Sequence, residues 1–373
     1  MSIYTVALGA NSIELGIISS IGGGISALLS APIGWLMDRY GLKQLYLLGI
    51  ALMAGSALTY AVAPSWPMII VATILFAIST RLTGTGCSVI CADSVKNRDR
   101  ATAQNICVTI ASIFSVIAPL AAAPLVTMFG GLNIEGIRPL YYLSFIGYIL
   151  VFFFLRAQLR EPDRVSTANS KPKPEFIGDI RRLLERGGPL KRWLIVASLT
   201  WFPISMTAPF LQLFAHQIKG ADQYLLGIMV TATILTRVLF GIPLGRLADK
   251  IGRKKVIFLI TPLWYASYLL LIFSSNSFTL ILSGALQTFY FISSGVTNAI
   301  TLELVPVEEM GTWSGLIGFF RGLVTIPAPI LGGLIWDNWN PIYVFLIPLA
   351  VDLLLKIPLL ATIPETLNPV DKE

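Results

Sequence analysis

Five charged residues lie inside long apolar runs of the sequence, where a charge is costly unless it is paired or functional. They are Arg81, Arg237, Arg321, Asp352 and Lys356. Asp352 and Lys356 are four residues apart, so a helix places them on one face, and we interpret them as a structural ion pair. The three arginines could bind an anionic solute, relay a proton or anchor a helix by packing. These roles stay open for Arg81 and Arg321, whereas Arg237 fits packing best.

Further side chains in apolar runs could hydrogen-bond a solute, namely Asn105, Trp201, Gln287, Tyr290 and Asn298. For each one alone, packing between helices is the competing interpretation. The sequence has one His and three Cys, and it contains no nucleophile–base or metal-ligand pattern. It also lacks a Gly-x-x-x-x-Gly-Lys-Ser/Thr phosphate cradle. We therefore expect a protein that is not an enzyme and that uses no metal, cofactor or ATP.

The elements that must position these residues are membrane helices. Only 13% of the 373 residues are charged, about half of the roughly 25% that is usual for soluble proteins. A spanning helix needs about 20 apolar residues, and runs of this length exclude a β-barrel. We predict an all-α integral membrane protein with eleven spans, near residues 13–37, 44–63, 66–91, 103–128, 138–158, 191–216, 224–247, 255–274, 278–304, 312–336 and 341–363.

The basic residues predict which side each loop occupies. Most of the 27 Lys and Arg fall in alternate loops and in the C-terminal tail, whereas the opposite loops hold only Arg138 and Lys219. The positive-inside rule makes the first group and the C-terminus cytoplasmic. Because the positive charge follows membrane topology, it does not indicate nucleic-acid binding. We expect an N-terminal bundle over 1–158, a linker with an amphipathic surface helix over 159–190, and a C-terminal bundle over 191–373.

The two halves repeat one another. Gly34, Asp38, Arg39 and Gly41 recur 211 residues later as Gly245, Asp249, Lys250 and Gly252, and Arg253 follows at once. In addition, Asp93 matches Glu303 and Ala118-Pro119 matches Ala328-Pro329, both at an offset of 210. Several matches at nearly one offset indicate an internal duplication.

The doubled Gly-x-x-x-Asp-Arg/Lys-x-Gly pattern resembles the hallmark loop of the major facilitator superfamily. The resemblance implies two six-helix bundles that rock about a central cavity. It also implies that the motif loops latch the cytoplasmic side, with Asp38 and Asp249 as the principal carboxylates and Asp93, Arg100 and Glu303 meeting them. The family has twelve helices. Since Met1 pairs with Gln212 at the offset of 211, we expect that the first helix is missing and that eleven are present.

We therefore expect a permease of the cell membrane that moves a small solute by alternating access, as a monomer. Arg81 is followed by Gly84 and Gly86, which partly resembles an element of proton-coupled family members, and we expect proton coupling. Export is the commonest role of family members of this type, and the sequence leaves the direction open. An organic-anion transporter is an alternative, motivated by the excess of positive charge within the spans. A non-transporting receptor or scaffold of the same fold is an alternative of another class.

Overall fold

The computed structural model describes residues 1–29, 33, 42–93, 100–159, 188–305, 310–363 and 365. For Asp93, Arg100 and Asn105 it describes the helix but not the side chain. Outside the described residues lie Gly34, Asp38, Arg39 and Gly41, as does the amphipathic helix expected in the linker. The chain divides into two compact units, Met1–Asn169 and Ser170–Glu373.

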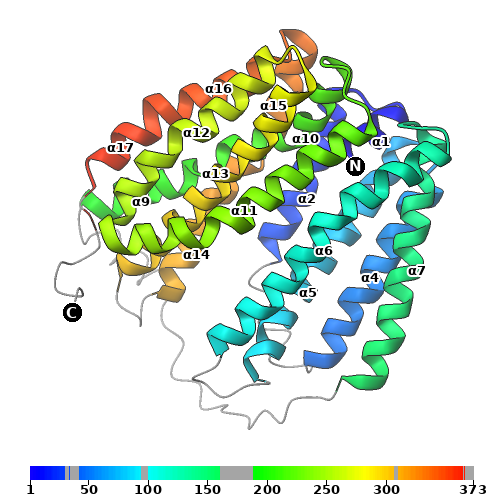
Figure 1. The fold of residues 1–373 in the computed structure, drawn as a ribbon. Helices are drawn as coiled ribbons and strands as arrows, with labels where there is room; N and C mark the ends of the chain where they lie inside the picture. Colours follow the sequence, from blue (N-terminus) through cyan, green and yellow to red (C-terminus); the bar gives the residue numbers. More distant parts are fainter. Residues whose placement is uncertain are drawn as a thin grey trace. The chain divides into compact units, whose positions relative to one another are not determined.

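The first unit is a helical bundle. Its described helices are α1 (Ser2–Ala7), α2 (Ser12–Leu28), α4 (Leu42–Val62), α5 (Trp66–Asp93), α6 (Arg100–Met128) and α7 (Ile134–Gln158). Helix α4 packs against α5 and α7, and α2 packs against α5 (Figure 1). The helix starts follow local capping chemistry, because Asn11 and Glu14 form a capping box on α2 and the Asn133 side chain caps α7.

The second unit is built from shorter and more interrupted helices. They are α9 (Gly188–Leu199), α10 (Phe202–Gln217), α11 (Gln223–Ile251), α12 (Arg253–Phe273), α13 (Ser277–Glu303), α14 (Met310–Thr325), α15 (Ala328–Asn338), α16 (Tyr343–Val351), the π-helix η3 (Asp352–Lys356) and α17 (Ile357–Ala361). Helix α13 packs against both α11 and α12, and α10 packs against α15 (Figure 1).

The described elements are all helical and form membrane spans where the sequence predicts them. Ten segments are long and apolar enough to cross a bilayer, and the shorter apolar helix Ser12–Leu28 occupies the predicted span that begins near residue 13. The predicted all-α multi-pass fold is thus confirmed. Many large apolar side chains on these helices are exposed, among them Phe114, Phe153 and Leu239, as expected where a helix contacts lipid.

Three of the predicted spans in the second unit are not continuous α-helices. The span at 191–216 breaks at Thr200 and Trp201, the span at 312–336 breaks at Ile326 and Pro327, and the last span contains a π-turn. Proline explains the first two breaks, since it lacks the backbone N–H that would donate a hydrogen bond to a carbonyl of the preceding turn. Pro203 is the second residue of the helix after the first break, Pro327 lies in the second break, and Pro329 is the second residue after it.

The duplicated Ala-Pro pair behaves differently in the two halves. Pro119 lies inside the continuous helix α6, whereas its counterpart Pro329 lies in the first turn of α15. The first half has one proline at this point, and the second half has Pro327 two residues earlier. The second missing N–H explains why the helix breaks there.

Candidate functional site

The motif turn of the second half joins α11 to α12 through the single residue Gly252. Its backbone has φ +111°, a conformation that residues other than glycine rarely adopt. Arg253 then pairs with Glu303 on α13, with 2.6 Å between Nη2 and Oε1. Asp249 is 3.7 Å from the same nitrogen, and its side chain is 67% exposed. Within its own unit, the arginine thus pairs more closely with Glu303 than with Asp249, the predicted principal latch carboxylate.

The other motif residues of this turn make fewer contacts. Lys250 is exposed, and a Cβ built at Gly245 would meet no atom within 4 Å. Close helix packing inside the second unit therefore does not explain the glycine at 245. The roles of these residues and of Asp249 in a latch stay predictions.

A carboxylate that sequence reasoning missed completes this turn. Glu365 accepts hydrogen bonds from the backbone N–H groups of Arg253 (3.1 Å) and Lys254 (3.2 Å), so it caps the start of α12. In return, the Lys254 ammonium donates to the carbonyls of Ala361 (2.8 Å) and Ile363 at the end of α17. Each helix end thus receives the charge that its dipole favours. We call these contacts the α12–α17 clamp.

A second group of residues gathers near the middle of the spans of unit 2, around the break at Thr200 and Trp201. The Tyr290 hydroxyl donates to the carbonyl of Thr200 at 2.6 Å. The Arg321 guanidinium lies over the Trp201 ring, 5.0 Å from its centroid. The break therefore presents a backbone carbonyl to a tyrosine and an aromatic ring to a cation. Sequence reasoning singled out Trp201, Tyr290 and Arg321 separately, and the structure brings them together.

An aromatic row on α12 connects this break to the charged pair of the last span. Trp264 contacts the rings of Tyr265, Tyr268 and Tyr290, with centroids 4.4, 5.6 and 5.7 Å away. The Tyr265 hydroxyl donates to Asp352 at 2.7 Å. Sequence reasoning missed these α12 aromatics, although the criterion that selected Tyr290, a polar tip in an apolar run, applies equally to Tyr265 and Tyr268.

The predicted pairing of Asp352 with Lys356 is present and buried. Lys356 Nζ lies 2.7 Å from Asp352 Oδ1, and the two side chains are 2% and 0% exposed. Both residues belong to the π-helix η3, in which the N–H of Ile357 donates to the Asp352 carbonyl five residues earlier. π-turns inside α-helices are frequent at functional sites.

The remaining candidate residues are spread over both units. Arg81 is exposed, and its Nε donates to the Ser26 hydroxyl at 2.6 Å. Arg237 is exposed and lies over the ring of Phe291, 5.6 Å from the centroid. Gln287 is half-buried beside Tyr268, and Asn298 is exposed. A guanidinium exposed midway along a spanning helix is costly in lipid, by about 2.5–3.5 kcal/mol, which favours a polar environment for Arg81 and Arg237.

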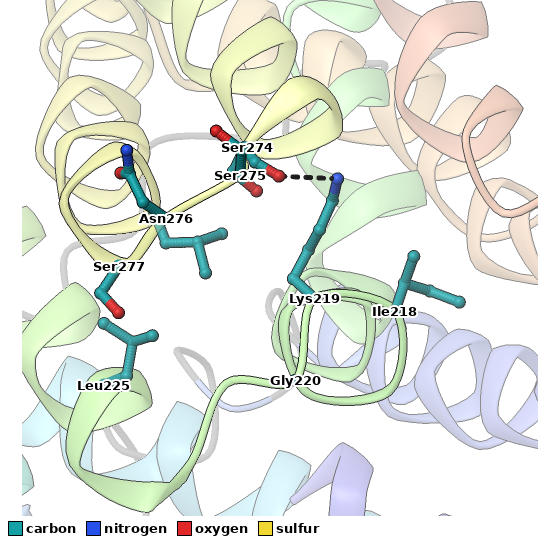
Figure 2. Close-up of a pocket in the computed structure, with 9 residues that line it drawn as sticks. Ile218, Lys219, Gly220, Leu225, Ser274, Ser275, Asn276 and Ser277 are labelled. Atoms are coloured by element: carbon teal, nitrogen blue, oxygen red, sulfur yellow. Dashed lines mark hydrogen bonds between the residues drawn. The ribbon is translucent and has the colours of Figure 1, made fainter.

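A pocket of about 380 Å³ lies at the end of unit 2 opposite the motif turn, where α10 and α12 end and α11 and α13 begin. Figure 2 shows the Lys219 ammonium reaching across it to the carbonyl of Ser274, at 3.1 Å. Lys219 also donates to the carbonyl of Ile272. The lysine thus caps the end of α12, and the pocket walls are mostly serine, asparagine and backbone.

In the first half, a different basic residue caps the equivalent helix end. Arg138 donates to the carbonyl of Ala63 at 2.6 Å, and Ala63 corresponds to Ser274 at the repeat offset of 211. The two basic residues that the charge pattern assigns to the outer loops therefore cap equivalent ends of α4 and α12. Their engagement with helix carbonyls explains why these two positions are basic.

Comparison with known proteins agrees with this architecture. The family model of the Major Facilitator Superfamily matches residues 1–235 and again residues 193–372. The chain belongs to the major facilitator superfamily. The family is one of transporters rather than enzymes, and the chain is accordingly a multi-pass membrane protein of a transporter family.

Individual relatives are distant, and several match only in part. The multidrug resistance protein 2 of Bacillus subtilis is 24% identical over 84% of this chain and 78% of its own length. The inner membrane transport protein YajR of Escherichia coli is 30% identical over 38% of this chain. Tetracycline resistance protein class B of Escherichia coli is 26% identical over 38% of this chain and 35% of its own length. An uncharacterized transporter of Buchnera aphidicola is 24% identical over 48% of this chain and 45% of its own length. The match to YajR covers 31% of the length of YajR.

Solved structures share the fold over nearly the whole chain. The nucleoside transporter NupG superimposes with a TM-score of 0.77 over 96% of this chain and 92% of NupG, at 15% identity. A bacterial homolog of the human lysosomal transporter Spinster gives a TM-score of 0.64 over 96% of this chain and 90% of the homolog, at 16% identity. At these identities the comparison establishes the fold and nothing about the solute.

Proposed function

We propose that this family member is a secondary transporter that moves a small solute by alternating access, exports it, and is driven by a proton gradient. The observation that carries the proposal is the polar cluster near mid-span in unit 2. There a helix within the apolar bundle is interrupted at Thr200 and Trp201. Tyr290 contacts the first of these residues and Arg321 the second. In transporters, interrupted helices near mid-membrane supply the backbone and side-chain groups that hold a solute.

The motif turn supports a conformational cycle. The ion pair of Arg253 with Glu303 ties α12 to α13, and the exposed carboxylate of Asp249 is available for a contact that forms in one state of the cycle. Such an alternation needs two arrangements that differ by only a few kcal/mol. The proposed direction, export, rests on relatives that are named for multidrug and tetracycline resistance.

The test is a transport screen. The purified chain in proteoliposomes is given a panel of labelled solutes, with the pH gradient imposed in either direction or absent. We expect at least one solute to move faster than in empty liposomes, and to move outward with respect to the cytoplasmic face under a proton gradient. As a matched test of the cycle, R253E should slow transport and R253E/E303R should restore part of it.

Two outcomes would contradict the proposal. No solute moving under any gradient would favour the non-transporting receptor or scaffold of the same fold. Transport that is unaffected by every pH gradient would contradict proton drive. Cysteine labelling of both cavity mouths that changes with the solute would exclude a static scaffold.

A second candidate is an organic-anion transporter, and one observation favours it. Among the described residues near mid-span, Arg81 and Arg237 are exposed, whereas the carboxylate of Asp352 is buried and neutralised by Lys356. An unbalanced guanidinium away from water favours an anionic ligand, which it can hold through two parallel hydrogen bonds. Uptake of a labelled carboxylate should fall in R81Q and less in R81K. Unchanged uptake in R81Q would count against this candidate.

A further inference from the structure

The residue that carries this inference is Asp352, the one carboxylate in the middle of a described span. The other described acidic residues lie at helix ends or beyond the helices. Glu14, Glu135 and Asp222 lie at helix starts, Asp249 and Glu303 in the last turns of α11 and α13, Asp337 near the end of α15, and Glu365 beyond α17. The single histidine, His216, lies in the last turn of α10. A proton carrier at mid-span therefore has one carboxylate candidate in the described part of the chain.

The surroundings of Asp352 combine burial with polar neighbours. Lys356 lies 2.7 Å from one carboxylate oxygen, and Tyr265 donates to the other at 2.7 Å. Tyr268 on α12 and Tyr290 on α13 are close enough to interact electrostatically with Asp352. Arg321 on α14 interacts electrostatically with Tyr290. Of the other elements near η3, α9 has its Lys191 and Arg192 exposed at its start, α16 has Tyr343 exposed at its start, and α17 carries no ionisable side chain.

Two polar atoms in this cluster are buried without a hydrogen-bond partner among the described residues. They are Asp352 Oδ1 and Trp264 Nε1. The first lies 2.7 Å from Lys356 Nζ, so an ion pair holds it where no hydrogen bond does. A buried pair whose attraction is not completed by hydrogen bonds repays less of its desolvation cost. The charge of Asp352 therefore depends on Lys356 and on the single hydroxyl of Tyr265.

The pair also lies on an irregular backbone and next to a row of aromatic side chains. Tyr265 is half-buried, and its hydroxyl contacts the buried carboxylate. The row from Tyr265 through Trp264 to Tyr290 ends at the Thr200 carbonyl in the helix break. The π-turn that holds both charged residues replaces the α-helical hydrogen bond by one to the carbonyl five residues earlier.

We propose that the Asp352–Lys356 pair is the proton-exchange site that couples this transporter to the proton gradient. The inference rests on the proposed function, because it presumes proton-driven transport. The Asp352 carboxylate takes up one proton from water on one side of the membrane and becomes the neutral acid. Lys356 then loses its counter-ion and Tyr265 loses a charged acceptor, which favours a different packing of η3 against α12. Release of the proton on the other side re-forms the pair, so one proton crosses per cycle.

The test separates coupling from folding and from solute binding. Proteoliposomes with a transported solute are assayed for transport driven by a pH gradient and for counterflow, in which unlabelled solute exchanges for labelled solute without net proton movement. We expect D352N to lose the driven transport and to keep counterflow at the wild-type rate. Since D352N leaves a buried lysine unpaired, D352N/K356Q provides a second variant with no buried charge, and it should behave in the same way. D352E should keep driven transport with a displaced pH profile.

Asp337 supplies a matched control, because D337N removes a carboxylate near the end of a span and should leave both measurements unchanged. Driven transport that survives in D352N/K356Q would overturn the proposal while the proposed function stands. Equal loss of driven transport and counterflow in a folded D352N/K356Q and in D352E would also overturn it, in favour of a structural pair. A wild-type protein that transports solute without any response to pH gradients would instead contradict the proposed function.

Discussion

Glu365 gives the sharpest test of how the second half is held together. Replacing it by glutamine keeps the size of the side chain and removes the charge from the start of α12. The carboxylate now accepts from two backbone N–H groups, those of Arg253 and Lys254. The amide has one oxygen to accept with, and its NH₂ group would face these donors in the other orientation. We expect E365Q to destabilise the α12–α17 clamp.

The magnitude follows from two contributions. A side-chain cap at a helix start is worth about 1 kcal/mol, and a negative charge near a helix N-terminus adds about 0.3–1 kcal/mol. Because Glu365 is exposed, salt screens part of the second contribution. A total loss of about 1–2 kcal/mol corresponds to a fall in Tm of about 2–8 °C for a unit of this size. The effect should shrink at high salt.

The assay is thermal unfolding of the purified protein in detergent, followed by tryptophan fluorescence or by loss of the monodisperse peak. The matched control is D249N on the same turn, since Asp249 is largely exposed and 3.7 Å from Arg253. We expect D249N to unfold close to the wild-type temperature. The reasoning would be refuted if E365Q were as stable as the wild type, or if D249N lost more stability than E365Q.

Three further substitutions test other contacts by the same thermal assay. G252A should lower stability by about 1–3 kcal/mol, because φ is +111° and a Cβ would lie 2.7 Å from Glu365 Oε2; G147A, at a site with open space, is its control. G332A should lower stability by about 1–3 kcal/mol, because a Cβ would lie 2.9 Å from the Met206 carbonyl. An unchanged Tm in G332A would show that α10 and α15 separate easily. K219M should cost about 1 kcal/mol by uncapping α12, whereas K255M, an exposed lysine on the same helix, should be neutral.

Much of the fold can be predicted from the sequence because it depends on properties that are local along the chain. A helix of about 20 apolar residues matches the thickness of the hydrocarbon core of a bilayer. Several predicted spans accordingly agree with a single helix within a few residues, as at 66–91 against Trp66–Asp93. The duplication is equally visible, because Asp249 and Gly252 keep the spacing of their counterparts. The i, i+4 spacing of Asp352 and Lys356 likewise sufficed to predict their pairing.

The tertiary structure decided what depends on partners distant in sequence. Pro119 and Pro329 are equivalent in sequence, yet one lies inside a helix and the other begins one. Glu365 meets Arg253 across more than a hundred residues, and no local pattern marks a tail carboxylate as the cap of a distant helix. Tyr265 points to Asp352 for the same reason. Hydropathy and helical spacing are one-dimensional and local, whereas capping, ring contacts and buried charge pairing depend on which helix surfaces meet. The sequence by itself thus determined the membrane architecture, and only the packed bundle determined which polar groups come together at mid-span.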